Sequence, residues 1–166
     1  MINSFSLERI NKTSFYTVES QKGHSFRFRT LNGYEYIVGF VEDNMIADDN
    51  SVYQFFIFTP NTSRPSADPG IPQTIIPIIE EFFSNDAVSL VYICDIKDGR
   101  QAARNRLFRS WFNSYNNKKD YTLISKELIL EGVQYYMCLL SRKDNPTLPE
   151  KTESMERLFE QLNSPK

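Results

Sequence analysis

The chain has 166 residues, 14% of them aromatic, and a formal net charge of −2 from 19 basic and 21 acidic side chains. This length suits one domain whose core needs no disulfide or metal, and the aromatic content argues against disorder. The charge favours neither nucleic acid nor a membrane surface as a partner. No apolar run approaches the ~18 residues of a membrane span, so we expect a single cytoplasmic domain over 1–166. Residues 1–12 are expected to be a loose segment or a short helical turn.

The first half of the chain has the patterns of a β-rich region. A short strand is expected at 15–19. Apolar and basic residues alternate at 25–30, an Asn-Gly dipeptide at 32–33 marks a tight turn, and alternation resumes at 34–41. These segments predict a β-hairpin. The run at 52–58 is apolar on both faces and predicts an interior strand.

A loop rich in proline and glycine follows at 60–70, and helical spacing of apolar residues then predicts a helix through about Asn85. Two positions for its start stay open. If Thr74 is the N-cap, Pro77 falls in the first turn, where its missing N–H is harmless. An earlier start would place a kink at Pro77.

The rest of the chain alternates strands with helices. The expected elements are a buried strand at 88–94, a helix from near Gly99, strands at 121–130 and 133–141, and a final helix capped by Thr147. The predicted order is therefore β-β-β-β-α-β-α-β-β-α. It indicates an α+β fold with a mixed, mainly antiparallel, twisted sheet and about three helices.

The helix after the 88–94 strand has an unusual distribution of charge. At about 100° per residue, four apolar or aromatic side chains form a stripe along one side of it. These are Ala103, Leu107, Trp111 and Tyr115. Arg100 and Arg104 fall on the same side, near the end of the strand and beside Asp95. Charged groups on a stripe that faces the core need a partner.

Three interpretations of Asp95, Arg100 and Arg104 stay open. An ion pair between Arg104 and Asp95 would pin the helix to the strand. Alternatively, Arg100 and Arg104 would bind a small anion together with the N–H groups at the helix N-terminus. The third interpretation is a contact with a partner protein. Arg64, in the loop before the preceding helix, is a further candidate ligand for an anion.

Other side chains suggest little chemistry. His24 is the single histidine, so neither a metal site nor a Ser/His/Asp set is expected. Cys94 and Cys138 lie in apolar strand patterns, which indicates buried, reduced thiols. The alternation of phenylalanine with Arg27 and Arg29 resembles a strand surface that binds nucleic acid, although the net charge makes this partner unlikely.

One block of the sequence carries a family resemblance. The run YICDIKDGRQAARNRLFRSWF at 92–112 is preceded by TIIPIIEEFF and followed by SRKDNP. With these flanks, the region from 26 to 162 resembles a family of small uncharacterised proteins from Bacteroidetes bacteria. The resemblance implies a cytoplasmic bacterial protein and no particular activity.

The order of elements resembles the core of the GCN5-related N-acetyltransferase fold without its first helices. This resemblance implies a glycine-rich pyrophosphate loop at 64–70, an acyl-CoA cleft at the next strand, and a tyrosine acid in the helix after it. In this chain, prolines stand at 65, 69 and 72 in that loop. Leu107 and Phe108 stand where the tyrosine would be.

The sequence therefore favours a non-catalytic binding or regulatory domain, with no catalytic residue and no cofactor. Its expected partner is an unknown protein, which includes a second copy of the chain, or a small anionic ligand. The expected contact surface is the edge formed by Asp95, Arg100 and Arg104. The alternative is an acyltransferase-like protein that uses acyl-CoA, and a weaker one is a nucleic-acid-binding protein.

Overall fold

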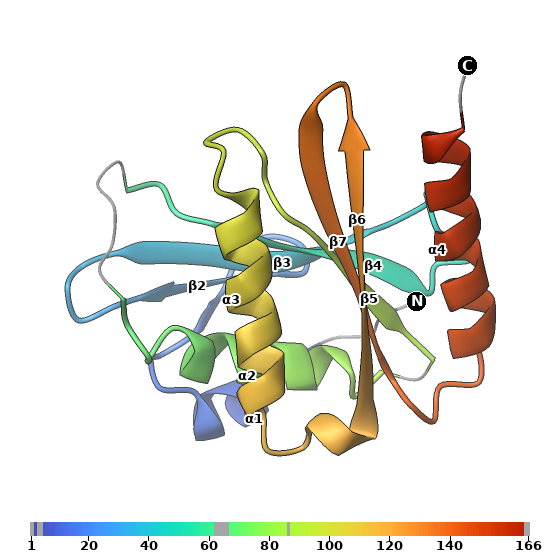
Figure 1. Cartoon of the computed structure of the whole chain (residues 1–166). Helices are drawn as coiled ribbons and strands as arrows, with labels where there is room; N and C mark the ends of the chain where they lie inside the picture. The colour runs from blue at the N-terminus through green and yellow to red at the C-terminus, as the bar shows by residue number, and fades with distance from the viewer. Residues whose placement is uncertain (1, 3–4, 62–66, 86, 165–166) are drawn as a thin grey trace. The chain divides into compact units, whose positions relative to one another are not determined.

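The computed structural model describes residues 2, 5–61, 67–85 and 87–164 of the chain. Figure 1 shows its helices and strands, which include one short 3-10 helix, η1. Their bounds are Leu7–Thr13 (α1), Glu19–Ser20 (β1), Ser25–Arg29 (β2), Glu35–Glu42 (β3), Val52–Phe58 (β4), Pro72–Phe82 (α2), Ser89–Ile93 (β5), Gln101–Ser114 (α3), Lys118–Asp120 (η1), Tyr121–Leu130 (β6), Val133–Arg142 (β7) and Leu148–Asn163 (α4).

The predicted fold class is confirmed. Neighbouring strands are hydrogen bonded in the order β1-β2-β3-β4-β5-β7-β6. The β4–β5 pair is parallel, whereas β1–β2, β2–β3, β5–β7 and β6–β7 are antiparallel. From β1 onward, the strands and α-helices also follow the predicted order. The N-terminal segment, expected to be loose or a short helical turn, forms α1.

The chain divides into two compact units. The first, called here the C-terminal unit, comprises Glu42–Gln54 and Ala87 onward. The second, the N-terminal unit, comprises Ile2–Val41 and Phe55–Asp86. Strand β4 therefore contributes its beginning to the C-terminal unit and its end to the N-terminal unit. That the chain is a single domain stays a prediction.

Aromatic side chains form the core of the N-terminal unit. Phe26 and Phe28 of β2 are both buried, which confirms the alternation predicted from the sequence. The ring of Phe28 stacks on Tyr36 of β3 with centroids 5.3 Å apart. Phe40 of β3 stacks on Phe82 of α2 at 4.6 Å. Large rings on alternate positions thus join the helix to the strands of this unit.

Helix α2 begins at Pro72, so the start at Thr74 is wrong and Pro77 lies inside the helix. Pro77 has no N–H to donate to the carbonyl of Gln73, four residues earlier. That carbonyl instead accepts a hydrogen bond from the backbone N–H of Phe15 at 3.3 Å. The proline therefore frees an acceptor that ties α2 to the chain following α1.

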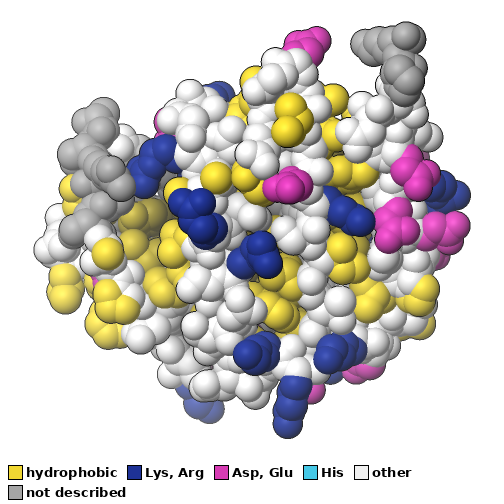
Figure 2. Space-filling model, viewed as in Figure 1, with side chains coloured by type: hydrophobic (Ala, Val, Ile, Leu, Met, Phe, Trp, Pro, Cys, Tyr) yellow, Lys and Arg dark blue, Asp and Glu magenta, His cyan; other side chains and the backbone are white. Residues whose placement is uncertain are grey.

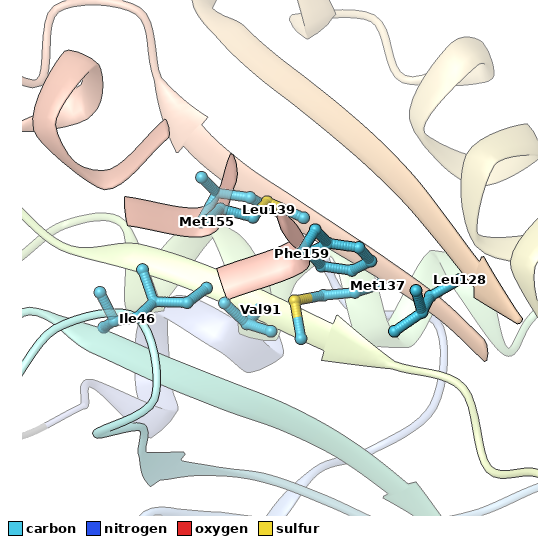
Figure 3. Close-up of a cluster of buried hydrophobic side chains, with 8 residues drawn as sticks. Ile46, Val91, Leu128, Met137, Leu139, Met155 and Phe159 are labelled. Atoms are coloured by element: carbon cyan, nitrogen blue, oxygen red, sulfur yellow. The ribbon is translucent and has the colours of Figure 1, made fainter. Parts of the chain in front are cut away.

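In the C-terminal unit, α4 covers one face of strands β5, β7 and β6. Val91 of β5 and Leu139 of β7 are fully buried there, together with Met137. Figure 3 shows Met155 and Phe159 of α4 packed among these side chains. Because α4 covers this face, β5 and β7 carry apolar side chains on it.

Helix α3 covers the other face of the same strands, and it does so by a different side than the sequence predicts. Its buried residues are Asn105 and Phe108, whereas Leu107 is 51% exposed. Phe108 packs on Tyr92 of β5 with ring centroids 4.6 Å apart. The Cys138 thiol of β7 donates to Asn105 Oδ1 at 3.4 Å. The helix turns this side to the sheet because Tyr92 and Cys138 contact Phe108 and Asn105 there. The spacing of apolar residues along α3 does not reveal these contacts.

Candidate binding face on helix α3

The loop between β5 and α3 is held by two aspartates that bind backbone N–H groups. Asp95 Oδ1 accepts from the N–H of Lys97 at 3.0 Å, and Asp98 Oδ1 accepts from the N–H of Arg100 at 3.1 Å. Gly99 follows Asp98 and has φ at +71°, a conformation that glycine adopts without strain. The carboxylates thus fix the entry into α3 from the strand.

Arg104 has a carboxylate partner, but the partner is Asp98 and not Asp95. Its Nη1 and Nη2 donate to Asp98 Oδ1 and Oδ2 at 2.7 and 2.5 Å, and Nη1 also donates to the Asp95 backbone carbonyl at 2.9 Å. The predicted Arg104–Asp95 ion pair is therefore wrong, because the Asp95 side chain is turned toward Lys97. The guanidinium holds the pKa of the Asp98 carboxyl well below its usual range.

The remaining candidate ligands are less engaged. Arg100 is exposed, precedes the first turn of α3 as its N-cap, and makes no ion pair with any described residue. The expectation that Arg100 lies on a core-facing stripe is wrong, since the helix turns that side to solvent. Arg64 lies outside the described residues. The structure therefore places Asp95 and Arg100 in the loop that leads into α3 and Arg104 in the first turn of the helix, where Asp98 neutralises Arg104.

The outward side of α3 carries cations without carboxylate partners. Arg106 and Arg109 are exposed, and neither they nor Arg100 form an ion pair within the described part of the chain. Exposed Leu107 lies among them. Figure 2 shows Lys and Arg side chains gathered over α3, with Asp and Glu concentrated toward α4. We call Arg100, Arg106, Leu107 and Arg109 the arginine face; the exposure of Arg100 and Leu107 contradicts the core-facing stripe predicted from the sequence.

Beneath α3, the two cysteines are buried and free, as predicted. Burial raises the pKa of the Cys94 thiol to about 12 and also raises the pKa of Cys138. Because a thiolate is the reactive form, both groups are poor nucleophiles at neutral pH. The cysteines therefore serve packing under the helix.

The arginines of β2 are already neutralised. Arg27 pairs with Glu19 at 2.6 Å and lies 3.9 Å from Glu35, and Arg29 lies 3.5 Å from Glu35. Two carboxylates for two guanidinium groups leave little positive potential on this strand. The alternation that resembles a nucleic-acid-binding strand is thus a cross-strand charge network.

The loop before α2, where the acetyltransferase resemblance implies a pyrophosphate site, has few free N–H groups among the residues described. The N–H of Gly70 donates to Asp68 Oδ1 at 2.8 Å, and that of Ile71 donates to the Asp68 carbonyl at 3.1 Å. Pro72 has no N–H. The Tyr16 hydroxyl donates to Asp68 Oδ2 at 2.6 Å, which raises the pKa of Tyr16. A carboxylate at this position disfavours a phosphate ligand.

Two kinds of functional element are absent from the described residues. No group of three or more His, Cys, Asp or Glu side chains lies in a geometry that holds a metal ion. Within the same residues, every helix is too short or too polar to cross a membrane.

Residues 67–157 of the chain match the model of a family described as Family of unknown function (DUF6169). No curated protein matches the sequence. Among solved structures, the chain is similar to one titled "The structure of a CoA-dependent acyl-homoserine lactone synthase, MesI". The two share 11% identity and a TM-score of 0.40, over 86% of this chain and 72% of the other. A likeness this distant says nothing about activity.

Proposed function

The chain belongs to this family of unknown function (DUF6169), and we propose that it is a non-catalytic binding domain whose arginine face receives an acidic segment of a partner protein. The supporting observation is that Arg100, Arg106 and Arg109 are exposed without carboxylate partners among the described residues. Guanidinium groups bind carboxylates through paired hydrogen bonds. Leu107, 51% exposed beside them, supplies an apolar contact of the kind found in protein interfaces.

The arginine face replaces the Asp95–Arg100–Arg104 edge as the proposed contact surface. A small anion at that edge would compete with the Asp98 carboxylate, which already accepts hydrogen bonds from both Nη atoms of Arg104. The arginine face has no such competitor, and its cations are spread over more than one helical turn. A segment with several carboxylates therefore fits this face better than a single small anion. We retain a cytoplasmic setting in a Bacteroidetes bacterium as part of the proposal.

A titration with designed peptides tests the proposal. The probe is a fluorescein-labelled peptide that alternates glutamate and leucine, measured by anisotropy at 50 and 200 mM salt. We expect saturable binding that weakens about tenfold in the double variant Arg106→Glu/Arg109→Glu, because two attractive contacts become repulsive. Arg157→Glu, an exposed charge reversal on α4, is the matched control and should change the affinity less than twofold.

Nucleic acid is the competing anionic partner, and the same variants separate it from an acidic protein segment. A 20-nucleotide single strand would bind with a steep salt dependence set by the number of phosphates contacted. Leu107→Ser should weaken the peptide and leave the nucleic acid unaffected, since phosphates need no apolar contact. Tighter binding of the oligonucleotide, with no effect of Leu107→Ser, would contradict the proposal.

The second candidate function is acyltransfer from acyl-CoA. It is favoured by the parallel pairing of β4 with β5, which α2 connects in sequence, as in the fold that the order of elements resembles. The N–H groups bound by Asp68 and the missing N–H of Pro72 argue against the usual pyrophosphate contacts. Calorimetric titration with acetyl-CoA decides between the two. Micromolar binding that Arg106→Glu/Arg109→Glu leaves unchanged would favour the acyltransferase and overturn the arginine face as the principal site.

A further inference from the structure

Strand β6 is the last strand in the sheet order and pairs only with β7. The two strands are joined by Glu131 and Gly132, whose φ angles of +51° and +78° are those of a tight two-residue hairpin turn. In such a hairpin, the flanking pair Leu130–Val133 exchanges both hydrogen bonds, and every second pair after it does the same. The backbone groups of the alternate residues of β6 therefore point away from β7.

These outward groups belong to Leu123, Ser125, Glu127 and Ile129. No backbone hydrogen bond outside the β6–β7 ladder involves them within the described residues. The edge thus offers a row of N–H donors and C=O acceptors over about 20 Å, at about 3.4 Å per residue. An open edge of this length is a template for another extended chain.

A groove of about 600 Å³ lies beside this edge, between β6 and the last two turns of α4. Lys126 and Glu127 of β6 line one wall, and Glu156 and Glu160 of α4 line the other, above the ring of Phe159. The buried Phe159 ties this part of α4 to the core, so the groove has a fixed wall. A strand added to the β6 edge would place every second side chain along this wall.

The groove selects for positive charge. Two carboxylates, those of Glu156 and Glu160, line it with one ammonium group, that of Lys126, whereas the Glu127 carboxylate accepts a hydrogen bond from Gln134. Asn163, the last residue of α4, also lines the groove, and the carbonyl end of a helix attracts cations. Neither Glu156 nor Glu160 is paired with a cation among the described residues. A basic side chain in the groove would therefore gain partners without displacing any.

The spacing of the glutamates matches an extended ligand. Glu156 and Glu160 lie one helical turn apart, a rise of about 6 Å. Side chains two residues apart on a strand point to the same face, and their Cα atoms lie about 6.8 Å apart. Two basic residues separated by one residue can thus each reach one glutamate. On the opposite face of the added strand, exposed Ile129 favours apolar side chains.

We propose that the β6 edge binds an extended segment of a partner protein in which basic and apolar residues alternate, by strand addition, with the basic residues in the groove beside α4. The segment gains main-chain hydrogen bonds from β6 and its specificity from Glu156 and Glu160. This surface is separate from the arginine face and does not depend on the function proposed above.

A second copy of the chain is a poorer occupant of the edge. Antiparallel pairing of two β6 strands around a two-fold axis sets residues of the same face opposite each other. The registers centred on Lys126 and on Glu127 each place that residue opposite its own copy, which leaves one central register, centred on Ser125, without like charges opposite each other. Like charges directly opposite in a sheet are destabilising. The edge therefore fits a different, basic segment better than it fits itself.

The test uses the full chain and three acetylated, amidated heptapeptides. TKVKVKT carries the proposed pattern, TEVEVET reverses its charge, and a TKVKVKT with alternate backbone nitrogens methylated keeps the charge but loses the edge hydrogen bonds. Titrations are followed by the ¹H–¹⁵N spectrum. We expect TKVKVKT alone to bind saturably, with shifts at the amides of Leu123, Ser125, Glu127 and Ile129.

Variants of the protein localise the binding. Glu156→Lys should weaken TKVKVKT about fivefold, whereas Glu153→Lys, the same charge change on an exposed α4 position outside the groove, should have less than a twofold effect. Ser125→Pro should weaken the peptide about tenfold, because it removes an outward N–H while β7 keeps its own hydrogen bonds.

Four results would overturn the proposal. They are equal binding of the methylated peptide, equal effects of Glu156→Lys and Glu153→Lys, shifts confined to residues outside β6 and α4, and a dimer in solution that Ser125→Pro converts to a monomer. The last result would assign the edge to a second copy of the chain. Sedimentation of the protein without peptide distinguishes it from the others.

Discussion

Helices α3 and α4 cover opposite faces of the same three strands, and they are attached in different ways. Helix α4 buries Met155 and Phe159 in an apolar cluster, whereas α3 buries one phenylalanine, Phe108, and the amide of Asn105. Helix α3 contains three arginines and no acid, and α4 contains four glutamates against exposed Arg157 and buried Lys151. The more firmly packed helix is thus acidic, and the less apolar one is basic.

The charge of each helix and its apolar packing on the sheet are therefore arranged independently in this unit. The apolar contacts of α4 leave its glutamates free along the groove. On α3, one arginine of the series, Arg104, is used to fix the helix entry, and Arg106 and Arg109 are left to solvent. Substitutions that remove attachment should therefore change stability, and substitutions of the free charges should change binding only.

The largest effect should come from the apolar attachment of α4. Met155 is fully buried, and Met155→Ala should lower the free energy of unfolding by about 3 kcal/mol through lost burial and a new cavity. Met45→Ala, at a position 52% exposed, should cost less than about 0.5 kcal/mol. Urea unfolding measured by circular dichroism checks both. Equal losses in the two variants would show that α4 is not held by this cluster.

A smaller effect should follow from the buried charge of α4. The Lys151 side chain is 1% exposed, and its Nζ donates to Asp49 Oδ2 at 2.5 Å. Asp49→Asn should cost about 2 kcal/mol, because it leaves the buried ammonium group with Glu150 alone, whose Oε1 lies 3.8 Å away. Lys151→Met removes the charge at similar volume and should cost less than about 1.5 kcal/mol. A larger loss for Lys151→Met than for Asp49→Asn in urea unfolding would contradict this account.

The pair that fixes the entry of α3 should show in the pH dependence. Arg104 lowers the pKa of Asp98, so the stabilisation is complete above the ordinary carboxyl pKa of about 4 and is lost as the pH falls through the lowered value. We expect the ¹³C signal of the Asp98 carboxyl to titrate at a lower pH in the wild type than that of an unpaired aspartate. In Arg104→Met the same signal should titrate nearer pH 4. An unchanged midpoint would exclude the ion pair in solution.

The smallest effect on folding should come from the arginine face itself. Arg106→Glu and Leu107→Ser replace exposed side chains and should each change the free energy of unfolding by less than about 0.5 kcal/mol. Phe108→Ala, the neighbouring buried position, should instead cost about 3 kcal/mol. Thermal unfolding of the three variants is the measurement. A large loss from Arg106→Glu would mean that the face has a structural partner.

The sequence predicted those parts of the fold that depend on neighbours along the chain. The apolar run of β5, the alternation in β2 and the turn at Asn32-Gly33 between β2 and β3 all follow from side-chain period and turn chemistry, and the structure has each of them. That Asp95, Arg100 and Arg104 lie near the junction of β5 and α3 also follows from the sequence, because they are within ten residues of each other.

The orientation of α3 and the partner of Arg104 were decided by the tertiary structure. Apolar spacing favoured the side of Leu107, but Tyr92 and Cys138 on the sheet receive Phe108 and Asn105. The burial of Lys151 likewise depends on Asp49, about a hundred positions away.

The amino-acid sequence by itself thus determined the class of the fold, the order of its elements and the concentration of arginines after β5. The tertiary structure decides which of those arginines are exposed without a carboxylate partner. It also places the β6 edge beside the glutamates of α4. The physical reason is that local periodicity fixes which residues share a face. Which face is buried, and which charges meet, depends on side chains brought together from distant parts of the chain.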